Sequence, residues 1–145
     1  FAQGIQVAET IAGLETRPVD DNLVPKVTFC EPEIASVGLS EAKAKDKYGA
    51  DAVVTSEFNV AGNAKSQILG TQGFVKLVAL KDGPIVGFHA IGARMGEQVG
   101  EGQLMVTWEA YADDVAALVH AHPTQNETLG EAAMALAGKP LHNHG

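Results

Sequence analysis

The sequence has little cysteine and no long apolar run, and each shortage excludes a class of protein. Cys30 is the single cysteine among 145 residues, so an internal disulfide or a two-cysteine redox pair cannot form within the chain. This cysteine usage favours a reducing, cytoplasmic location. No apolar stretch approaches the roughly 18 residues of a membrane helix, so a membrane protein is not expected.

Basic residues are also scarce. Eighteen acidic residues against ten basic ones give a formal net charge of −8, and the isoelectric point is near 5.0. A surface of this charge repels a phosphate backbone or an anionic membrane rather than attracting it. Neither nucleic acid nor a membrane is therefore an expected partner.

The remaining composition is that of a folded domain, with 46% hydrophobic residues, 19% charged residues and 16 glycines. Apolar residues at 1, 5, 8 and 12 predict a helix that ends at Gly13. The segment 14–22 is acidic, contains a proline and lacks apolar periodicity, which is typical of a linker. We expect residues 1–22 to be the last helix and linker of another domain, and residues 23–145 to form a domain of their own. The alternative is a helix that packs on this same domain.

Strand signals come first along the chain and helix signals follow. Apolar and alternating runs predict strands over 24–30, 34–39, 51–60, 73–80 and 85–92. Ser40 caps a predicted helix that ends at Gly49, and residues 96–137 are predicted to be helical, with breaks at 112–114 and 120–123. This order indicates an α+β fold, with an antiparallel sheet of about five strands backed by helices.

The densest group of ionisable side chains lies in the segment His120-Ala-His-Pro-Thr-Gln-Asn-Glu127. A histidine titrates near neutral pH and can transfer a proton when a carboxylate holds its ring in one tautomer. His122 and Glu127 could form such a pair. Glu127 also stands three residues after Thr124, the spacing of a capping box, in which case His122 would be an ordinary loop residue. The spacing leaves both interpretations open.

A metal site is a weaker hypothesis. The pairs His120/His122 and His142/His144 have the i, i+2 spacing that places two rings on one face of an extended segment. The chain contains no zinc-ligand spacing, so we expect no metal.

Four other features have ordinary structural interpretations. The glycine-rich segment 87–97 lacks the spacing of a dinucleotide or phosphate loop. His89 is expected to be a hydrogen-bonded strand residue, and Cys30 a small buried apolar residue. Trp108 and Tyr111, three residues apart, are expected to share a helix face as core or interface anchors.

Four segments together resemble one family. HPTQNETLGEA is similar to the His-Pro-Thr-x-x-Glu signature of the flavin-dependent disulfide reductases, in particular the dihydrolipoyl dehydrogenases. VPKVTFCEPEIASVGLSEAKAK, AGNAKSQILGTQGFVKLVA and IGARMGEQVGE also resemble that branch, especially its actinobacterial members. Sister families typically place a second acid directly after the conserved glutamate, whereas Thr128 follows Glu127 here. The resemblance covers essentially residues 1–145.

The resemblance implies that the chain is a C-terminal interface (dimerisation) domain of a homodimer. His122 would then be the acid–base group that takes the proton from the dihydrolipoamide thiol, and Glu127 would orient it. The backbone of His122 and Pro123 would lie against the FAD of the partner subunit, with a cis bond between the two residues. His120 would lie near the substrate channel.

The resemblance also implies a larger enzyme that uses FAD and NAD and that accepts electrons from the lipoyl domain of 2-oxo acid dehydrogenase complexes. The family's G-x-G-x-x-G loops and Cys-x-x-x-x-Cys redox pair do not occur in these 145 residues. We therefore expect the chain alone to bind no cofactor and to be inactive, and residues 1–13 to match the last helix of an FAD-binding domain. Two alternatives remain: a sister flavin disulfide reductase with a low-molecular-weight disulfide substrate, and a non-catalytic self-association module.

Overall fold

The computed structural model describes residues 1–142, which form an α+β fold. The strands are β1 (Lys26–Thr28), β2 (Glu33–Gly38), β3 (Val53–Asn59), β4 (Phe74–Leu80) and β5 (Ile85–Gly92). The α-helices are α1 (Ala2–Ile11), α2 (Glu41–Tyr48), α3 (Ala64–Leu69), α4 (Met95–Thr107), α5 (Ala112–Ala116) and α6 (Glu127–Leu136). Short 3-10 turns occur at η1 (Asp21–Leu23), η2 (Ala50–Ala52) and η3 (Val60–Gly62).

The strands form one antiparallel sheet in the order β1-β2-β5-β4-β3. The central strand β5 and its neighbour β4 are joined by the Lys81-Asp82-Gly83-Pro84 turn, in which Asp82 has a positive φ of 57°. The strand β5 pairs with β2, which precedes α2 in the sequence, and with β4, which follows α2. Segments from both sides of α2 therefore meet at the centre of the sheet. The predicted five-stranded antiparallel sheet is confirmed.

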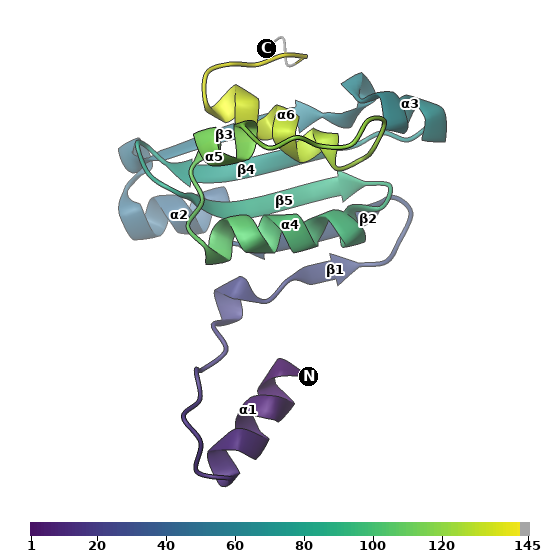
Figure 1. Cartoon of the computed structure of the whole chain (residues 1–145). Coiled ribbons are helices and arrows are strands. Elements are labelled where there is room, and N and C mark those ends of the chain that lie inside the picture. Colours follow the sequence, from purple (N-terminus) through teal and green to yellow (C-terminus); the bar gives the residue numbers. More distant parts are fainter. Residues whose placement is uncertain (143–145) are drawn as a thin grey trace.

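Two helices cover one face of this sheet. Figure 1 shows α4 and α6 on the near side, where α4 packs on β2 and β5 and α6 packs on β3 and β4. The buried core lies between these layers, with Phe58, Leu77, Phe88 and Leu129 among its fully buried side chains. At Gly102 a Cβ atom would lie 2.6 Å from the ring of Phe88, so only glycine allows α4 to approach the sheet this closely.

The first helix differs from the rest of the chain. No residue of α1 is buried, and its apolar side chains, including Ile5 and Ile11, are exposed. Figure 1 shows α1 away from the sheet, joined to it by an extended segment. The helix bounds agree with the prediction, since α1 ends beside Gly13, which has a φ of 73°.

Several local predictions are confirmed and others are wrong. Ser40 caps α2, with its Oγ accepting from the Lys43 N–H, and α2 ends at Gly49 as predicted. Cys30 is exposed rather than buried, because its strand ends two residues earlier. Trp108 and Tyr111 do not share a helix face, because α4 ends at Thr107. The helix break predicted at 112–114 is wrong, because α5 begins at Ala112, with Tyr111 as its N-cap.

Candidate functional site

The segment between α5 and α6 forms a compact turn at the surface. The His122–Pro123 peptide bond is cis, as the resemblance predicted. The Thr124 hydroxyl donates to the Ala121 carbonyl oxygen at 2.6 Å and closes the turn on itself. This hydrogen bond places His122 within a closed turn, and Glu127 follows three residues after the turn closes at Thr124.

His122 and Glu127 meet in this structure. The Nδ1 atom of His122 lies 2.8 Å from Oε1 of Glu127. The Thr124 backbone N–H donates to the other carboxylate oxygen, Oε2, at 2.8 Å. Both carboxylate oxygens of Glu127 are thus hydrogen-bonded. The His122 side chain remains 70% exposed while that of Glu127 is 23% exposed.

The two interpretations of the Thr124–Glu127 spacing are both partly realised. Glu127 accepts from the Thr124 N–H, which is one half of a capping box. The other half is absent, because the Thr124 hydroxyl turns back to Ala121. The helix consequently begins later than predicted, with Asn126 as the N-cap of α6. One carboxylate serves the turn and the histidine together.

The charged form of Glu127 is stabilised by its neighbours. Partial burial on its own raises the pKa of the carboxyl, but the hydrogen bonds from the Thr124 N–H and from His122 outweigh burial and lower its pKa. Glu127 is therefore an ionised acceptor near neutral pH. Because an ionised carboxylate only accepts, Nδ1 of His122 carries the proton in this contact.

His120 is in a different environment, although it stands only two residues away. Its side chain is 9% exposed, and its Nε2 lies 2.9 Å from Oε1 of Glu101 on α4. The other oxygen of Glu101 accepts from Asn126 Nδ2 at 2.5 Å. Gly130 leaves room for this ring, since a Cβ there would lie 2.8 Å from its Nδ1. The two histidines thus have separate partners and do not face one ion.

The His120–Glu101 contact favours the charged forms of both groups. The hydrogen bond that His120 donates to Glu101 raises the pKa of His120 more than burial lowers it. Burial raises the pKa of Glu101, but the hydrogen bonds of His120 and Asn126 outweigh burial, so that its pKa is lowered. The result is a part-buried ion pair that ties the turn to α4.

Sequence reasoning missed the residues that anchor the turn from the other side. Asn63 donates from Nδ2 to the Thr124 carbonyl oxygen at 3.0 Å. Ser66 donates to Oε1 of the buried Gln125 at 2.8 Å, and Gln125 donates in turn to the Ala93 carbonyl oxygen at 3.1 Å. The turn is therefore fixed to α3 and to the β5–α4 connection.

A sequence signal for this anchor exists, because Asn63 is the N-cap of α3 and its Oδ1 accepts from the Ser66 N–H three residues later. Gly70 ends the same helix in the left-handed conformation. These two residues could have predicted α3, which was not expected. They could not have predicted that Gln125, 59 residues beyond Ser66, packs against it.

The remaining candidates have structural roles. His89 is a hydrogen-bonded strand residue as expected, with Nε2 3.0 Å from the Leu39 carbonyl oxygen. Within residues 1–142, no group of three His, Cys, Asp or Glu side chains has the arrangement of a metal site. His142 pairs with Glu131 instead, and His144 lies outside the described residues.

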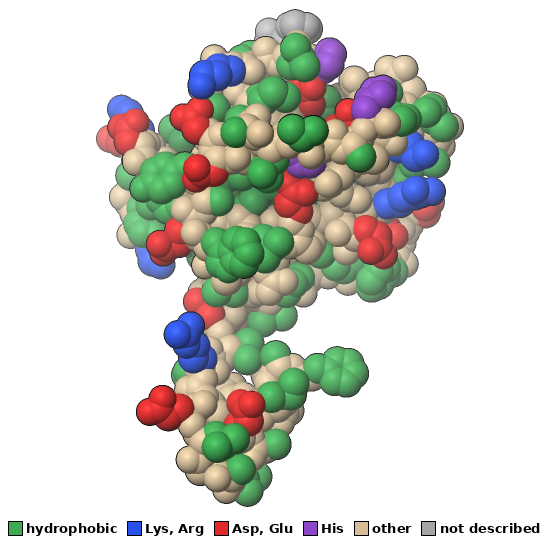
Figure 2. Space-filling model, viewed as in Figure 1, with side chains coloured by type: hydrophobic (Ala, Val, Ile, Leu, Met, Phe, Trp, Pro, Cys, Tyr) green, Lys and Arg blue, Asp and Glu red, His purple; other side chains and the backbone are tan. Residues whose placement is uncertain are grey.

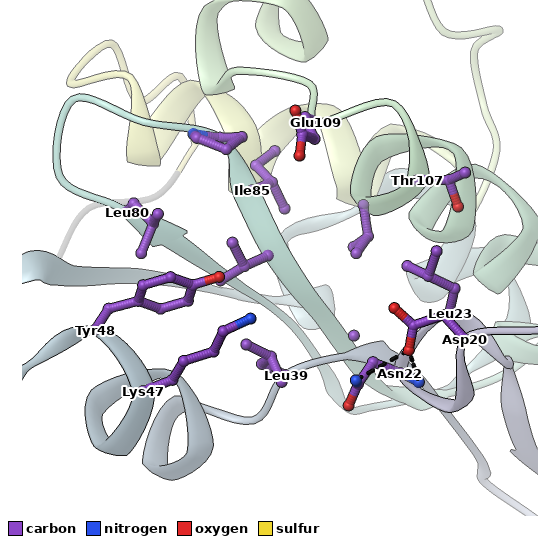
Figure 3. Close-up of a pocket in the computed structure, with 14 residues that line it drawn as sticks. Asp20, Asn22, Leu23, Leu39, Lys47, Tyr48, Leu80, Ile85, Thr107 and Glu109 are labelled. Atoms are coloured by element: carbon purple, nitrogen blue, oxygen red, sulfur yellow. Dashed lines mark hydrogen bonds between the residues drawn. The ribbon is translucent and has the colours of Figure 1, made fainter.

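A cavity of about 310 Å³ lies apart from the histidine pairs, between η1, the end of α2 and the end of α4. Figure 3 shows Lys47 and Tyr48 pointing into it beside Leu39 and Ile85, with Asp20 hydrogen-bonded to Asn22. No described histidine lines this cavity. Among the described helices, none combines the length and the apolarity needed to cross a membrane.

Comparison with known proteins places this arrangement in a family. The model of the dimerisation domain of pyridine nucleotide-disulphide oxidoreductases matches residues 24–133. Dihydrolipoyl dehydrogenases of Mycobacterium tuberculosis and Bacillus subtilis are 43% and 40% identical to the chain over 140 and 142 residues. These matches cover 94% and 97% of the chain but 30% of each relative, so the chain spans about 30% of their length.

Solved structures show the same fold. LpdA from Mycobacterium tuberculosis aligns with a TM-score of 0.81 at 23% identity, over 90% of this chain and 28% of that one. The HOCl-induced flavoprotein disulfide reductase RclA from Escherichia coli aligns with a TM-score of 0.79 at 18% identity, over 89% of this chain and 30% of that one. At these identities the likeness concerns the fold alone.

Proposed function

The chain belongs to the dimerisation-domain family of the pyridine nucleotide-disulphide oxidoreductases, and from that premise we propose that it supplies the acid–base pair of a dihydrolipoyl dehydrogenase to a partner subunit. The single observation that carries the proposal is the His122–Glu127 contact of 2.8 Å on a ring that is 70% exposed. A pair that served only the fold would gain by burial, whereas this one presents its ring to the outside.

The proposed chemistry is a proton transfer from a thiol. Glu127 holds the Nδ1–H of His122, so Nε2 accepts the proton of a dihydrolipoamide S–H group, and the ring becomes an imidazolium paired with the carboxylate. The thiolate that remains is the nucleophile that can attack a disulfide sulfur. On the return step Nε2 gives the proton back. Bound FAD and NAD would supply the electron transfer.

The residues at the turn fit the proposed neighbour. Ala121, His122 and Pro123 are all exposed, so their backbone can lie against the flavin of the partner subunit. The chain's own part is to orient His122 there and to move its proton.

The proposed homodimer is supported by the surface beside this turn. Large apolar side chains are exposed on and after α4 and α5: Leu104 (47%), Trp108 (74%), Leu118 (56%) and Val119 (99%). Figure 2 shows hydrophobic side chains over these helices on the face toward the viewer. An exposed apolar surface of this kind is typical of a protein interface. We propose that a two-fold interface forms there and brings His122 to the partner's site.

The other parts of the proposal concern the domain division, His120 and the substrate. The exposed apolar side chains of α1 would pack on an FAD-binding domain, with residues 14–22 as the linker and residues 23–145 as the interface domain. His120 would lie at the wall of the substrate channel through its contact with Glu101. The substrate would be the lipoyl domain of a 2-oxo acid dehydrogenase complex.

The test is the same substitution at two histidines of a complete enzyme that contains this chain. His122→Gln removes the proton acceptor, and the turnover of dihydrolipoamide with NAD should fall about 100-fold or more. His89→Gln is the matched control, because His89 bonds to a carbonyl on another part of the sheet, and its turnover should stay near wild type. Near-wild-type turnover of His122→Gln would refute the acid–base role.

The molar mass of the 145-residue chain in solution, measured by light scattering over a range of concentrations, tests the interface. A dimer is expected, and Val119→Glu on the exposed apolar surface should dissociate it. If Val119→Glu dissociates the dimer but leaves the turnover of the complete enzyme unchanged, a self-association module is favoured. Preference for a low-molecular-weight disulfide over lipoamide, with the same dependence on His122, would favour a sister reductase.

A further inference from the structure

A further histidine–glutamate pair lies one helical turn along α6 from the His122–Glu127 pair. His142 Nδ1 lies 2.6 Å from Oε1 of Glu131, and the His142 backbone N–H donates to Oε2 of the same carboxylate at 3.1 Å. A single residue thus engages both oxygens of Glu131. The contact folds the segment after α6 back along the helix that it has just left.

Glu131 needs this partner because it is buried. Its side chain is 9% exposed, whereas that of His142 is 60% exposed. A carboxylate removed from water is costly unless it is paired and hydrogen-bonded. The two contacts from His142 therefore decide whether the carboxylate is tolerated in this position.

Both pairs border one small cavity of about 160 Å³. Its lining is formed by Phe58, Gly62, Asn63 and Ala64 on one side and by His122, Glu127, Glu131 and His142 on the other. Glu127 and Glu131 are four residues apart on α6, a spacing that places them on the same helix face and at which like charges repel. Each carboxylate has its own imidazole.

We propose that His142 is a positioning residue for the acid–base pair. By satisfying both oxygens of Glu131, it keeps that carboxylate from drawing His122 away from Glu127. When the imidazole of His142 is removed, Oε1 of Glu131 loses its donor, and the exposed His122 ring, which lines the same cavity, is a donor that can replace it. This inference rests on the proposed function for its effect on catalysis, but not for its effect on the His122 ring.

The test separates charge from packing. His142→Ala removes the ring contact to Oε1 of Glu131 and leaves the backbone N–H of residue 142 as the donor to Oε2, and the double variant His142→Ala/Glu131→Gln removes the under-compensated charge as well. Lys139→Ala is the matched control, because Lys139 is in the same segment and its contact with Asp113 is exposed and remote from the cavity. The readouts are the ¹⁵N signals of the His122 ring in the 145-residue chain, and kcat and KM in a complete enzyme that contains it.

His142→Ala should shift the His122 ring signals and lower kcat about tenfold with little change in KM, because misplacement of a catalytic group by about 1 Å can cost about 100-fold. The double variant should restore both readouts, and Lys139→Ala should change neither. Unchanged His122 signals in His142→Ala would overturn the proposal. A double variant as impaired as His142→Ala would also overturn the proposal, because it would show that His142 only packs the segment after α6. A different outcome would separate the two proposals. If the double variant restores the His122 ring signals while the separate His122→Gln variant keeps full turnover in the complete enzyme, the proposed function is refuted and the positioning role stands.

Discussion

His120 and His122 are separated by one residue, and each pairs with a glutamate at nearly the same distance, 2.9 and 2.8 Å. The side chain of His120 is 9% exposed and that of His122 is 70% exposed. The buried pair joins two segments 19 residues apart and holds the turn in place. The exposed pair is the one for which we propose a proton transfer. On that proposal the same chemical pairing serves stability in one case and reactivity in the other, and exposure separates the two roles.

The largest expected effect on the comparison comes from His120→Ala. It leaves the part-buried Glu101 carboxylate with Asn126 as its remaining hydrogen-bond donor, so the free energy of unfolding should fall by about 2–3 kcal/mol. Urea unfolding of the 145-residue chain measures this. The control is Lys139→Ala, which breaks an exposed pair and should cost less than about 1 kcal/mol. Equal losses in the free energy of unfolding would show that the part-buried His120–Glu101 pair stabilises the fold no more than the exposed Lys139–Asp113 pair.

A somewhat smaller effect is expected at Gly130. In Gly130→Ala the new Cβ would lie 2.8 Å from Nδ1 and 3.0 Å from Cε1 of His120, so the ring must move away from Glu101. Overpacking of this kind costs about 1–3 kcal/mol. Gly100→Ala is the matched control, because a Cβ at that helical position meets nothing within 4 Å and should be neutral or stabilising. Urea midpoints that rank the two variants the other way would contradict the packing.

The pH dependence of stability sharpens the comparison further. The folded state raises the pKa of His120 from 6.5 and lowers that of Glu101 from 4.5. The His120 contribution is complete below pH 6.5 and is lost as pH rises through its raised pKa. The Glu101 contribution is complete above pH 4.5 and is lost as pH falls through its lowered pKa. The pair should therefore stabilise the fold most between about pH 4.5 and 6.5, with losses on both sides.

Unfolding of wild type and His120→Gln across pH 4 to 9 tests this window. The difference between the two curves should be largest inside the window and should narrow on both sides. A difference that stays constant with pH would mean that His120 contributes packing alone.

The smallest expected effect is that of His122→Gln on stability. Because the ring is 70% exposed and its contact lies at the surface, the free energy of unfolding should change by less than about 0.5 kcal/mol. The same variant is expected to lose most of its turnover in a complete enzyme. A large loss of stability would mean that His122 supports the turn and would weaken the division between the two histidines.

Much of the fold follows from local signals in the sequence. Alternating apolar residues identified every strand of the sheet, and Ser40 and Gly49 marked both ends of α2. The His122–Glu127 pairing was one of two open interpretations, and the structure shows that the carboxylate contacts both Thr124 and His122. Errors occurred where local rules compete: Thr124 has the spacing of an N-cap, but its hydroxyl bonds to Ala121.

By itself, the sequence determined the strands, most of the helices and the His122–Glu127 segment of the site, because hydrophobic periodicity, caps and turn residues act over a few neighbouring positions. Only the tertiary structure decided which histidine is buried and which carboxylate each one meets. Glu101 reaches His120 across 19 residues, and Ser66 reaches Gln125 across 59. No local pattern specifies such contacts, since they depend on how α3, α4 and α6 pack around one turn, and burial is a property of the packed assembly rather than of the segment.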